Sequence, residues 1–198
     1  DATLDEAKMM DEILEKAEKP PTDEIDMILG SEIVGIICHE SCGHPQEADR
    51  ILGREAAQAG ESYLKSNMIG FKVGSEHVTV VDDPTLPHSY GYYDYDDEGV
   101  KARKRVLIDH GKIAGFLHNR ETAAELNTDS NASSRSVGFD REPIVRMANT
   151  YMEPGDHSFE ELLEDVHHGV FMKTFMEWNI DDKRYNETER GVRASLVT

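Results

Sequence analysis

The stretch His39-Glu40-Ser41-Cys42-Gly43-His44 places two imidazoles around a carboxylate at the end of an apolar run. Histidine is a common ligand of divalent transition metals, and a neighbouring glutamate that is not a ligand can deprotonate metal-bound water. In the zinc-protease helix H-E-x-x-H the two histidines lie four residues apart on one face. Here they are five apart, which on a regular α-helix separates them by about 140° rather than about 40°. Both rings can face one ion only if the helix is widened by one residue, as in a π-bulge.

The residues inside and after the motif favour such a widened turn. Pro45 has no N–H to offer the carbonyl of Ser41, and its ring crowds that carbonyl. It also biases His44 away from the α region. Gly43 tolerates unusual torsions within the same turn. The sequence therefore supplies a mechanism for bringing His44 round to the side of His39.

Around the motif, the pattern of apolar residues predicts helices and one short strand. A capping box followed by an apolar stripe predicts a helix over residues 3–17. Residues 26–29 read as a strand, and Ser31 reads as the N-cap of a motif helix that runs to about Arg50. Apolar side chains surround the first half of this helix, so we expect that half to be buried and able to hold ligands in fixed rotamers.

From residue 70 onward the apolar residues alternate, which predicts strands. The expected strands are residues 78–81, 105–108, 113–117 and 144–152, with a hairpin turn at 109–112. Short helices are expected at residues 120–126 and from Ser158 to about His168, with Gly169 as the stop. Because hairpins join the strands more often than helices do, the sequence predicts an α+β fold. Its mainly antiparallel sheet should pack against the metal-motif helix.

Composition places the chain among globular proteins. Its 198 residues are enough for one domain with a core, and its net charge of -19 would repel the phosphates of a nucleic acid. Hydrophobic content is 38%, and no apolar run approaches the roughly 20 residues that cross a bilayer. The two cysteines, Cys38 and Cys42, fit a reducing compartment. We therefore expect a cytoplasmic protein that binds neither nucleic acid nor membrane.

Two loops are open to more than one interpretation. Residues 83–99 carry four tyrosines among five acidic groups. They fit a solvated strand whose tyrosines pack on the core, a substrate cleft, or a calcium loop built on Asp94, Asp96 and Glu98. The Ser/Asn-rich stretch over residues 128–142 fits a lid over the site and a mobile connector equally well.

Two residues near the motif also have alternative interpretations. Glu47, three residues after His44, could orient a ligand or bind metal, although a surface glutamate at a helix end fits nearly as well. Cys42 could donate a thiolate to the same ion, but we favour a small buried thiol. The remaining histidines have no motif around them, and we assign them no role.

Four blocks of sequence carry a further signal. They are the motif with its flanks from Gly35 to Asp49, Val80 to Pro87, Asp96 to Gly99, and Arg146 to Gly155. In this order they resemble the TldD/PmbA family of metallopeptidases. The resemblance implies a zinc-dependent peptidase that acts on unfolded or extended polypeptide, usually as part of a two-subunit assembly.

The same resemblance implies roles for the motif residues. His39 and His44 would be ligands of Zn²⁺, and Glu40 would be the general base. Two features depart from the family pattern. Pro45 stands where family members often have a small flexible residue, and the family takes its third ligand from a downstream cysteine, whereas no cysteine follows Cys42 here.

Family members are also markedly longer than this chain. We therefore expect residues 1–19 to be a helix that ends a preceding domain. Residues 20–198 should form a metallopeptidase-like domain that is incomplete at its C-terminus. The expected activity is hydrolysis of polypeptide by water activated at the metal, in a homodimer or in a heterodimer with a related subunit. The alternatives are a non-catalytic peptide-binding or scaffold subunit of such an assembly, and a hydrolase with a non-peptide substrate.

Overall fold

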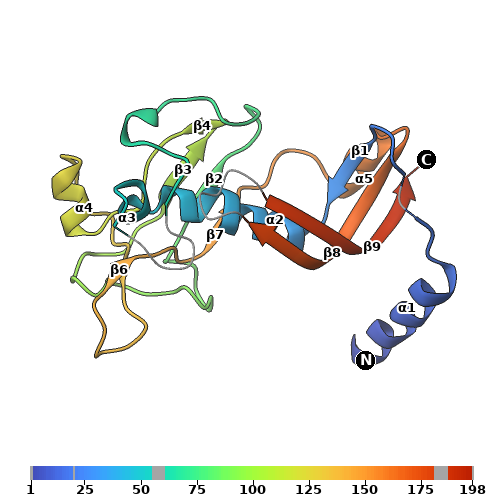
Figure 1. Cartoon of the computed structure of the whole chain (residues 1–198), viewed down its shortest axis with the longest axis horizontal. Helices are drawn as coiled ribbons and strands as arrows, with labels where there is room; N and C mark the ends of the chain where they lie inside the picture. Colours follow the sequence, from blue (N-terminus) through green and yellow to red (C-terminus); the bar gives the residue numbers. More distant parts are fainter. Residues whose placement is uncertain (1, 20, 55–60, 181–186, 198) are drawn as a thin grey trace.

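The computed structural model describes residues 2–19, 21–54, 61–180 and 187–197. The motif helix connects two sheets that lie toward opposite ends of the molecule (Figure 1). One sheet has the strand order β1-β8-β9 and the other β4-β3-β2-β7, while β5 and β6 form a separate pair. None of the helices in the described ranges is long and apolar enough to cross a membrane.

The elements have the following bounds. The helical elements are α1 (Ala2–Lys16), α2 (Ser31–Ile37), the π-helical turn η1 (Cys38–Gly43), the 3₁₀ turn η2 (His44–Gln46), α3 (Ala48–Ile51), the 3₁₀ turn η3 (Ser66–Met68), α4 (Arg120–Glu125) and α5 (Phe159–Glu164). The strands are β1 (Asp26–Leu29), β2 (Val80–Asp82), β3 (Arg105–Asp109), β4 (Lys112–Ile113), β5 (Ser134–Arg135), β6 (Ile144–Val145), β7 (Thr150–Met152), β8 (Gly169–Ile180) and β9 (Glu187–Val197).

The prediction of a mainly antiparallel α+β fold is confirmed. The described strand pairings are antiparallel except that of β1 with β8. The motif helix packs on the four-stranded sheet, because Cys38 forms a buried cluster with Val80 of β2 and Ile108 of β3. At the end of the π turn, Gly43 approaches Met147 so closely that a β-carbon would collide with its sulfur. The sheet therefore holds the start of the turn that carries the motif, and Met147, which lies between β6 and β7, packs against its end.

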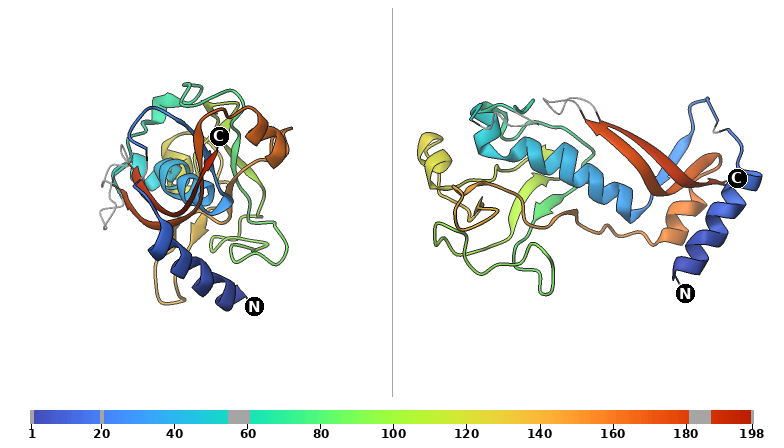
Figure 2. Two further views of the ribbon diagram at one scale, coloured as in Figure 1. Left: turned by 90° about the vertical axis from the view of Figure 1, so that its right-hand side faces the viewer. Right: turned by 60° about the horizontal axis from the view of Figure 1, so that its bottom comes forward.

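The first helix and the first strand occur where the sequence predicts them, as α1 and β1. Helix α1 buries none of its residues and projects from the end of the molecule that carries the β1-β8-β9 sheet (Figure 2). The hairpin at residues 109–112 is also confirmed. His110 and Gly111 both have positive φ, 45° and 73°, which is the conformation that a two-residue turn between twisted strands requires.

The predicted single helix from Ser31 to Arg50 is wrong in three respects. Gly30, rather than Ser31, is the N-cap, and it makes no side-chain hydrogen bond. The helix ends at Gln46, and Glu47 is extended with φ −69° and ψ 115° before α3 begins. A tertiary pairing causes the break, since the backbone on both sides of Glu47 hydrogen-bonds to Leu117. The first half is also less buried than expected, because only Ile33 and Cys38 in that half are fully buried.

Three predictions in the second half of the chain also need correction. The strand expected at 113–117 ends at Ile113, because Leu117 pairs with the segment after the motif instead. The strand expected at 144–152 is divided into β6 and β7. Helix α5 has the predicted capping box at Ser158 but ends at Glu164, and Gly169 begins strand β8 rather than stopping a helix. The long ribbon of β8 and β9 was not predicted.

Candidate metal centre

The motif adopts the widened turn that its spacing predicts. Residues Cys38–Gly43 form a π-helical turn, and the N–H of His44 donates to the carbonyl of His39, five residues earlier. A regular α-helix would pair residues four apart. The extra residue brings the second imidazole back toward the first, which confirms the predicted π-bulge.

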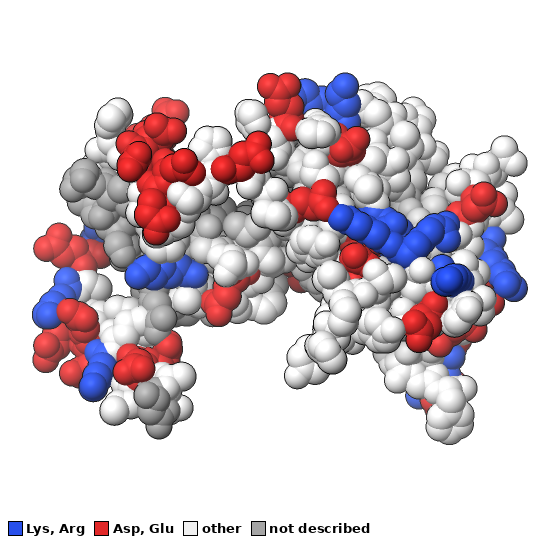
Figure 3. All heavy atoms as spheres, turned by 180° about the vertical axis from the view of Figure 1, so that it is seen from behind, with Lys and Arg blue, Asp and Glu red and all other residues white. Residues whose placement is uncertain are grey.

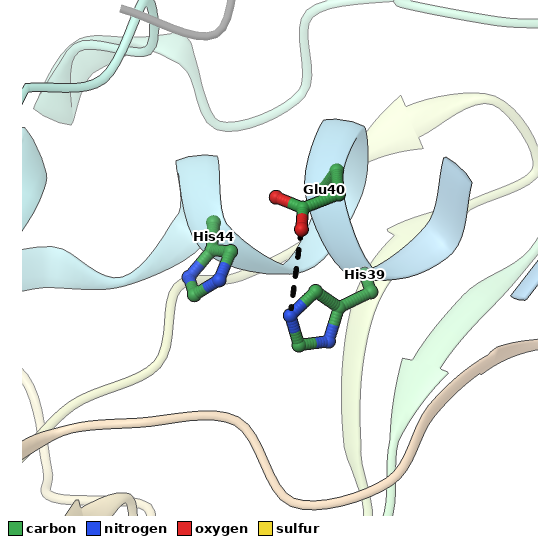
Figure 4. Close-up of side chains that lie close together, drawn as sticks. All are labelled: His39, Glu40 and His44. Carbon is green, nitrogen blue, oxygen red and sulfur yellow. Dashed lines mark ion pairs between the residues drawn. The ribbon is translucent and has the colours of Figure 1, made fainter. Parts of the chain in front are cut away.

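The two imidazoles and the carboxylate between them face one another (Figure 4). The ring centroids of His39 and His44 are 4.6 Å apart, with the rings at 82° to each other. Glu40 Oε1 lies 3.9 Å from His39 Nε2. One potential ligand atom from each of the three residues falls within 4.8 Å of the others. The side chain of His39 is 52% exposed, whereas those of Glu40 and His44 are 12% and 16% exposed. The cluster is thus reached from solvent on the His39 side.

The donor set fits a divalent transition metal. Zinc binds imidazole nitrogens at about 2.0–2.1 Å in a tetrahedral arrangement, and the potential ligand atoms of this cluster lie within 4.8 Å of one another. Across the described ranges, no other group of three His, Cys, Asp or Glu side chains converges in this way. Two imidazoles and one carboxylate are the donors that these residues provide.

Glu47 lies directly behind His44. Its side chain is fully buried, and its Oε2 lies 2.8 Å from His44 Nδ1 and 2.5 Å from Arg50 Nε. Arg146 Nη1 lies 3.6 Å from the same oxygen. Burial by itself would raise the pKa of Glu47, but the hydrogen bond and charge of His44 and the two guanidinium groups outweigh burial and lower that pKa. The interpretation of Glu47 as a surface residue is therefore wrong.

Asp49 is a second buried carboxylate close to the motif, and it does not contact His44. Its oxygens accept hydrogen bonds from the backbone N–H groups of Arg50 and Val145. Burial, followed by the negative charge of Glu47, raises its pKa to about 6. Asp49 thus joins the segment after the motif to strand β6.

Cys42 packs as a small apolar residue. It lies against the buried cluster of Cys38, Val80 and Ile108 and does not belong to the group of potential metal ligands. Cys42 is thus a thiol packed against the core, although it is half-buried rather than buried as expected.

The tyrosine-rich loop does not form a strand or a calcium site. Its three candidate carboxylates have separate partners. Asp94 accepts from a tyrosine hydroxyl, Asp96 from backbone N–H groups and Glu98 from the N–H of Arg120. In the second loop, over residues 128–142, a central segment is packed into the fold, since Ala132, Ser133 and Ser134 are buried.

Sequence reasoning assigned His118 no role, and the structure places it in a cavity. The side chain is buried, which lowers its pKa to about 4. It lines a cavity of about 490 Å³ together with Phe116, Asn131 and the basic residues Arg103 and Lys104. Figure 3 shows a row of basic side chains on this half of the molecule, flanked by acidic ones. The motif residues do not line this cavity, so it is separate from the metal centre.

Comparison with known proteins identifies the family. Residues 22–196 match the family described as the PmbA/TldA metallopeptidase C-terminal domain. This chain belongs to that family. The resemblance to TldD/PmbA proteins that the sequence blocks carry is thereby confirmed.

Relatives agree with this assignment, and a solved structure shares the fold. The chain is 42% identical over 158 residues to a metalloprotease of Methanocaldococcus jannaschii, covering 80% of this chain and 33% of the relative. It is 34% identical to a zinc metalloprotease TldD homolog of Saccharolobus solfataricus, covering 79% and 34%. The chain thus spans about a third of the length of these relatives. The crystal structure of TldE from Thermococcus kodakarensis shares the fold, with a TM-score of 0.72 at 23% identity, over 88% of this chain and 38% of that one.

Proposed function

We propose that this chain carries the centre of a zinc-dependent peptidase that hydrolyses unfolded or extended polypeptides. The observation that supports this most directly is the π turn, which brings the rings of His39 and His44 to 4.6 Å with Glu40 beside them. The names of the relatives support a metalloprotease, and one of those names includes zinc. The family resemblance supports extended polypeptide as the substrate class.

In this proposal His39 and His44 hold the ion, and Glu40 handles protons. When bound, zinc polarises a carbonyl and lowers the pKa of water toward about 7. The Glu40 carboxylate, only 12% exposed and beside both rings, accepts the proton of the attacking water. It then donates that proton to the amine that leaves when the peptide bond breaks. The exposed side of His39 leaves an approach for the substrate.

A non-catalytic role in a larger assembly is the second candidate. It is favoured by the donor set, because the described residues offer two imidazoles and one carboxylate. Assembly with a related subunit, and the division into residues 1–19 and 20–198, are part of the same proposal.

Two variants separate these functions. We expect the protein to bind about one zinc per chain and His39→Ala to lose it, as measured by metal analysis after dialysis. Glu40→Gln should keep the zinc and lose hydrolysis of a denatured protein by at least about 100-fold, because general base catalysis contributes that much. A folded form of the same substrate serves as the control. Full activity in Glu40→Gln would contradict the assigned base, and absence of zinc from the wild type would favour the scaffold role.

A further inference from the structure

We infer that Glu47 is a positioning residue that fixes the tautomer and the orientation of the His44 ring. This inference rests on the proposed function in one respect, that a metal is the species to which the ring is presented. The inference itself concerns the hydrogen bond between His44 Nδ1 and Glu47 Oε2, which leaves the other ring nitrogen, Nε2, for an ion.

The direction of the hydrogen bond follows from the chemistry of its two partners. An ionised carboxylate only accepts hydrogen bonds, so at the 2.8 Å contact His44 Nδ1 must carry the hydrogen and donate it to Glu47 Oε2. In a neutral imidazole the lone pair is then on Nε2. The contact therefore selects the tautomer whose Nε2 is free to bind an ion.

Two arginines allow the buried carboxylate to remain an anion beside a neutral ring. Arg50 donates to the same oxygen from 2.5 Å, and Arg146 Nη1 lies 3.6 Å from it. A buried charge without such compensation would be strongly destabilising. Glu47 therefore has two cationic partners besides the His44 ring.

Backbone hydrogen bonds on both sides of Glu47 hold it in place, in addition to the burial of its side chain. The N–H of Leu117 donates to the carbonyl of Gln46, and the N–H of Ala48 donates to the carbonyl of Leu117. These two bonds clamp the extended residue between η2 and α3. A ring that is hydrogen-bonded to a clamped carboxylate loses most of its freedom to rotate, so His44 is oriented before an ion arrives.

The first test uses the metal-free wild-type protein. Long-range ¹H–¹⁵N spectra at about pH 8 distinguish the Nδ1–H from the Nε2–H tautomer of each histidine, and His44→Gln assigns the signal of His44. We expect the Nδ1–H form at His44. An Nε2–H form would overturn the inference whether or not the protein is a peptidase.

The second test compares zinc affinity in two variants. Glu47→Gln should weaken zinc binding by about 10- to 100-fold, the usual effect of losing a partner behind a ligating histidine. Asp49→Asn is the matched control, because it neutralises a buried carboxylate on the same segment that does not contact His44, and it should change affinity less than about threefold. Equal affinities of Glu47→Gln and wild type, or equal losses in both variants, would overturn the inference. Thermal unfolding of both metal-free variants shows whether they are folded, and if Glu47→Gln is not, the wild-type tautomer decides.

Discussion

The molecule contains two buried carboxylate–arginine pairs that are alike in chemistry and different in surroundings. Glu47 pairs with Arg50, and Asp82 pairs with Arg105, and both carboxylates are completely buried. Asp82 also accepts hydrogen bonds from the N–H of Ala148 and a threonine hydroxyl, and Arg105 donates to backbone carbonyls. All of these partners belong to the scaffold. The Glu47 pair has His44, a proposed metal ligand, as an additional partner.

This difference shows how one kind of interaction can serve two purposes. Burying an ion pair costs desolvation, which is offset only when the remaining hydrogen-bonding groups are satisfied. Asp82 meets this requirement with groups from β3 and β7, so its pair joins three strands of one sheet. Glu47 meets it only at Oε2, which contacts the His44 ring and Arg50, while Oε1 has no hydrogen-bond partner among the described residues. The same kind of pair thus orients a side chain of the site.

The largest effect is expected from breaking the scaffold pair. Asp82→Asn leaves Arg105 buried without its counter-ion and should lower the free energy of unfolding by about 3–5 kcal/mol. Urea denaturation measures this loss. The fraction that stays folded should bind zinc as the wild type does, whereas Glu47→Gln should lose zinc affinity. A specific loss of zinc affinity in Asp82→Asn would erase the distinction between the two pairs.

A smaller effect is expected from a pair of glycine substitutions in the motif helix. In Gly43→Ala the new methyl group meets the sulfur of Met147, and overpacking of this kind should cost about 1–3 kcal/mol and weaken zinc binding. Gly35 has no neighbouring atom within 4 Å of an added β-carbon. Gly35→Ala should therefore stabilise the protein by up to about 1 kcal/mol through helix propensity. Thermal unfolding measures both, and a harmless Gly43→Ala would show that the π turn is not held by packing.

The smallest expected effect is on how the stability of the fold depends on pH. Each of the two pairs has a buried titratable group nearby. His118, whose carbonyl lies next to the segment that accepts from Arg105, has its pKa lowered to about 4 by burial. The unfolded state, with a pKa near 6.5, binds the extra proton between about pH 6.5 and 4, so this group destabilises the fold as pH falls. Asp49, beside Glu47, has its pKa raised to about 6. Its contribution is present at low pH and is lost as pH rises through 6.

The two slopes oppose each other between about pH 4 and 6. We therefore expect His118→Gln to lose less stability on acidification than the wild type, and Asp49→Asn to lose more. Denaturation midpoints at pH 4.5 and 7 check both. Parallel pH profiles in the two variants would show that one of the groups does not titrate as its burial implies.

The part of the site that sequence could predict is the part fixed by covalent neighbours. Pro45 and Gly43 impose their torsional limits wherever the chain lies, so the widened turn between the two histidines was predictable. The position of Glu47 was not, since its burial depends on Leu117 and Arg146, which are distant in sequence. The pattern around a residue does not reveal which remote segment will cover it.

The same limit explains the parts of the fold that were missed. Strand β1 was predictable from its own residues. Its pairing with the parallel strand β8 was not, because β8 begins at Gly169, far away in the sequence. The ribbon of β8 and β9 is held by pairing between two long strands rather than by a strong local alternation. The expected strand at 113–117 ended early for a related reason, because Leu117 pairs with the segment after the motif.

The backbone hydrogen bond from the N–H of His44 to the carbonyl of His39 has an evolutionary consequence. Relative to H-E-x-x-H, the motif carries one inserted residue, and deleting Ser41 would restore the shorter spacing on paper. In space that deletion would rotate everything after it by about 100°, and it would carry His44 and Glu47 together out of phase with Met147 and Leu117, which contact this segment. Removing the inserted residue alone would therefore break the contacts that Met147 and Leu117 make with the segment after the turn.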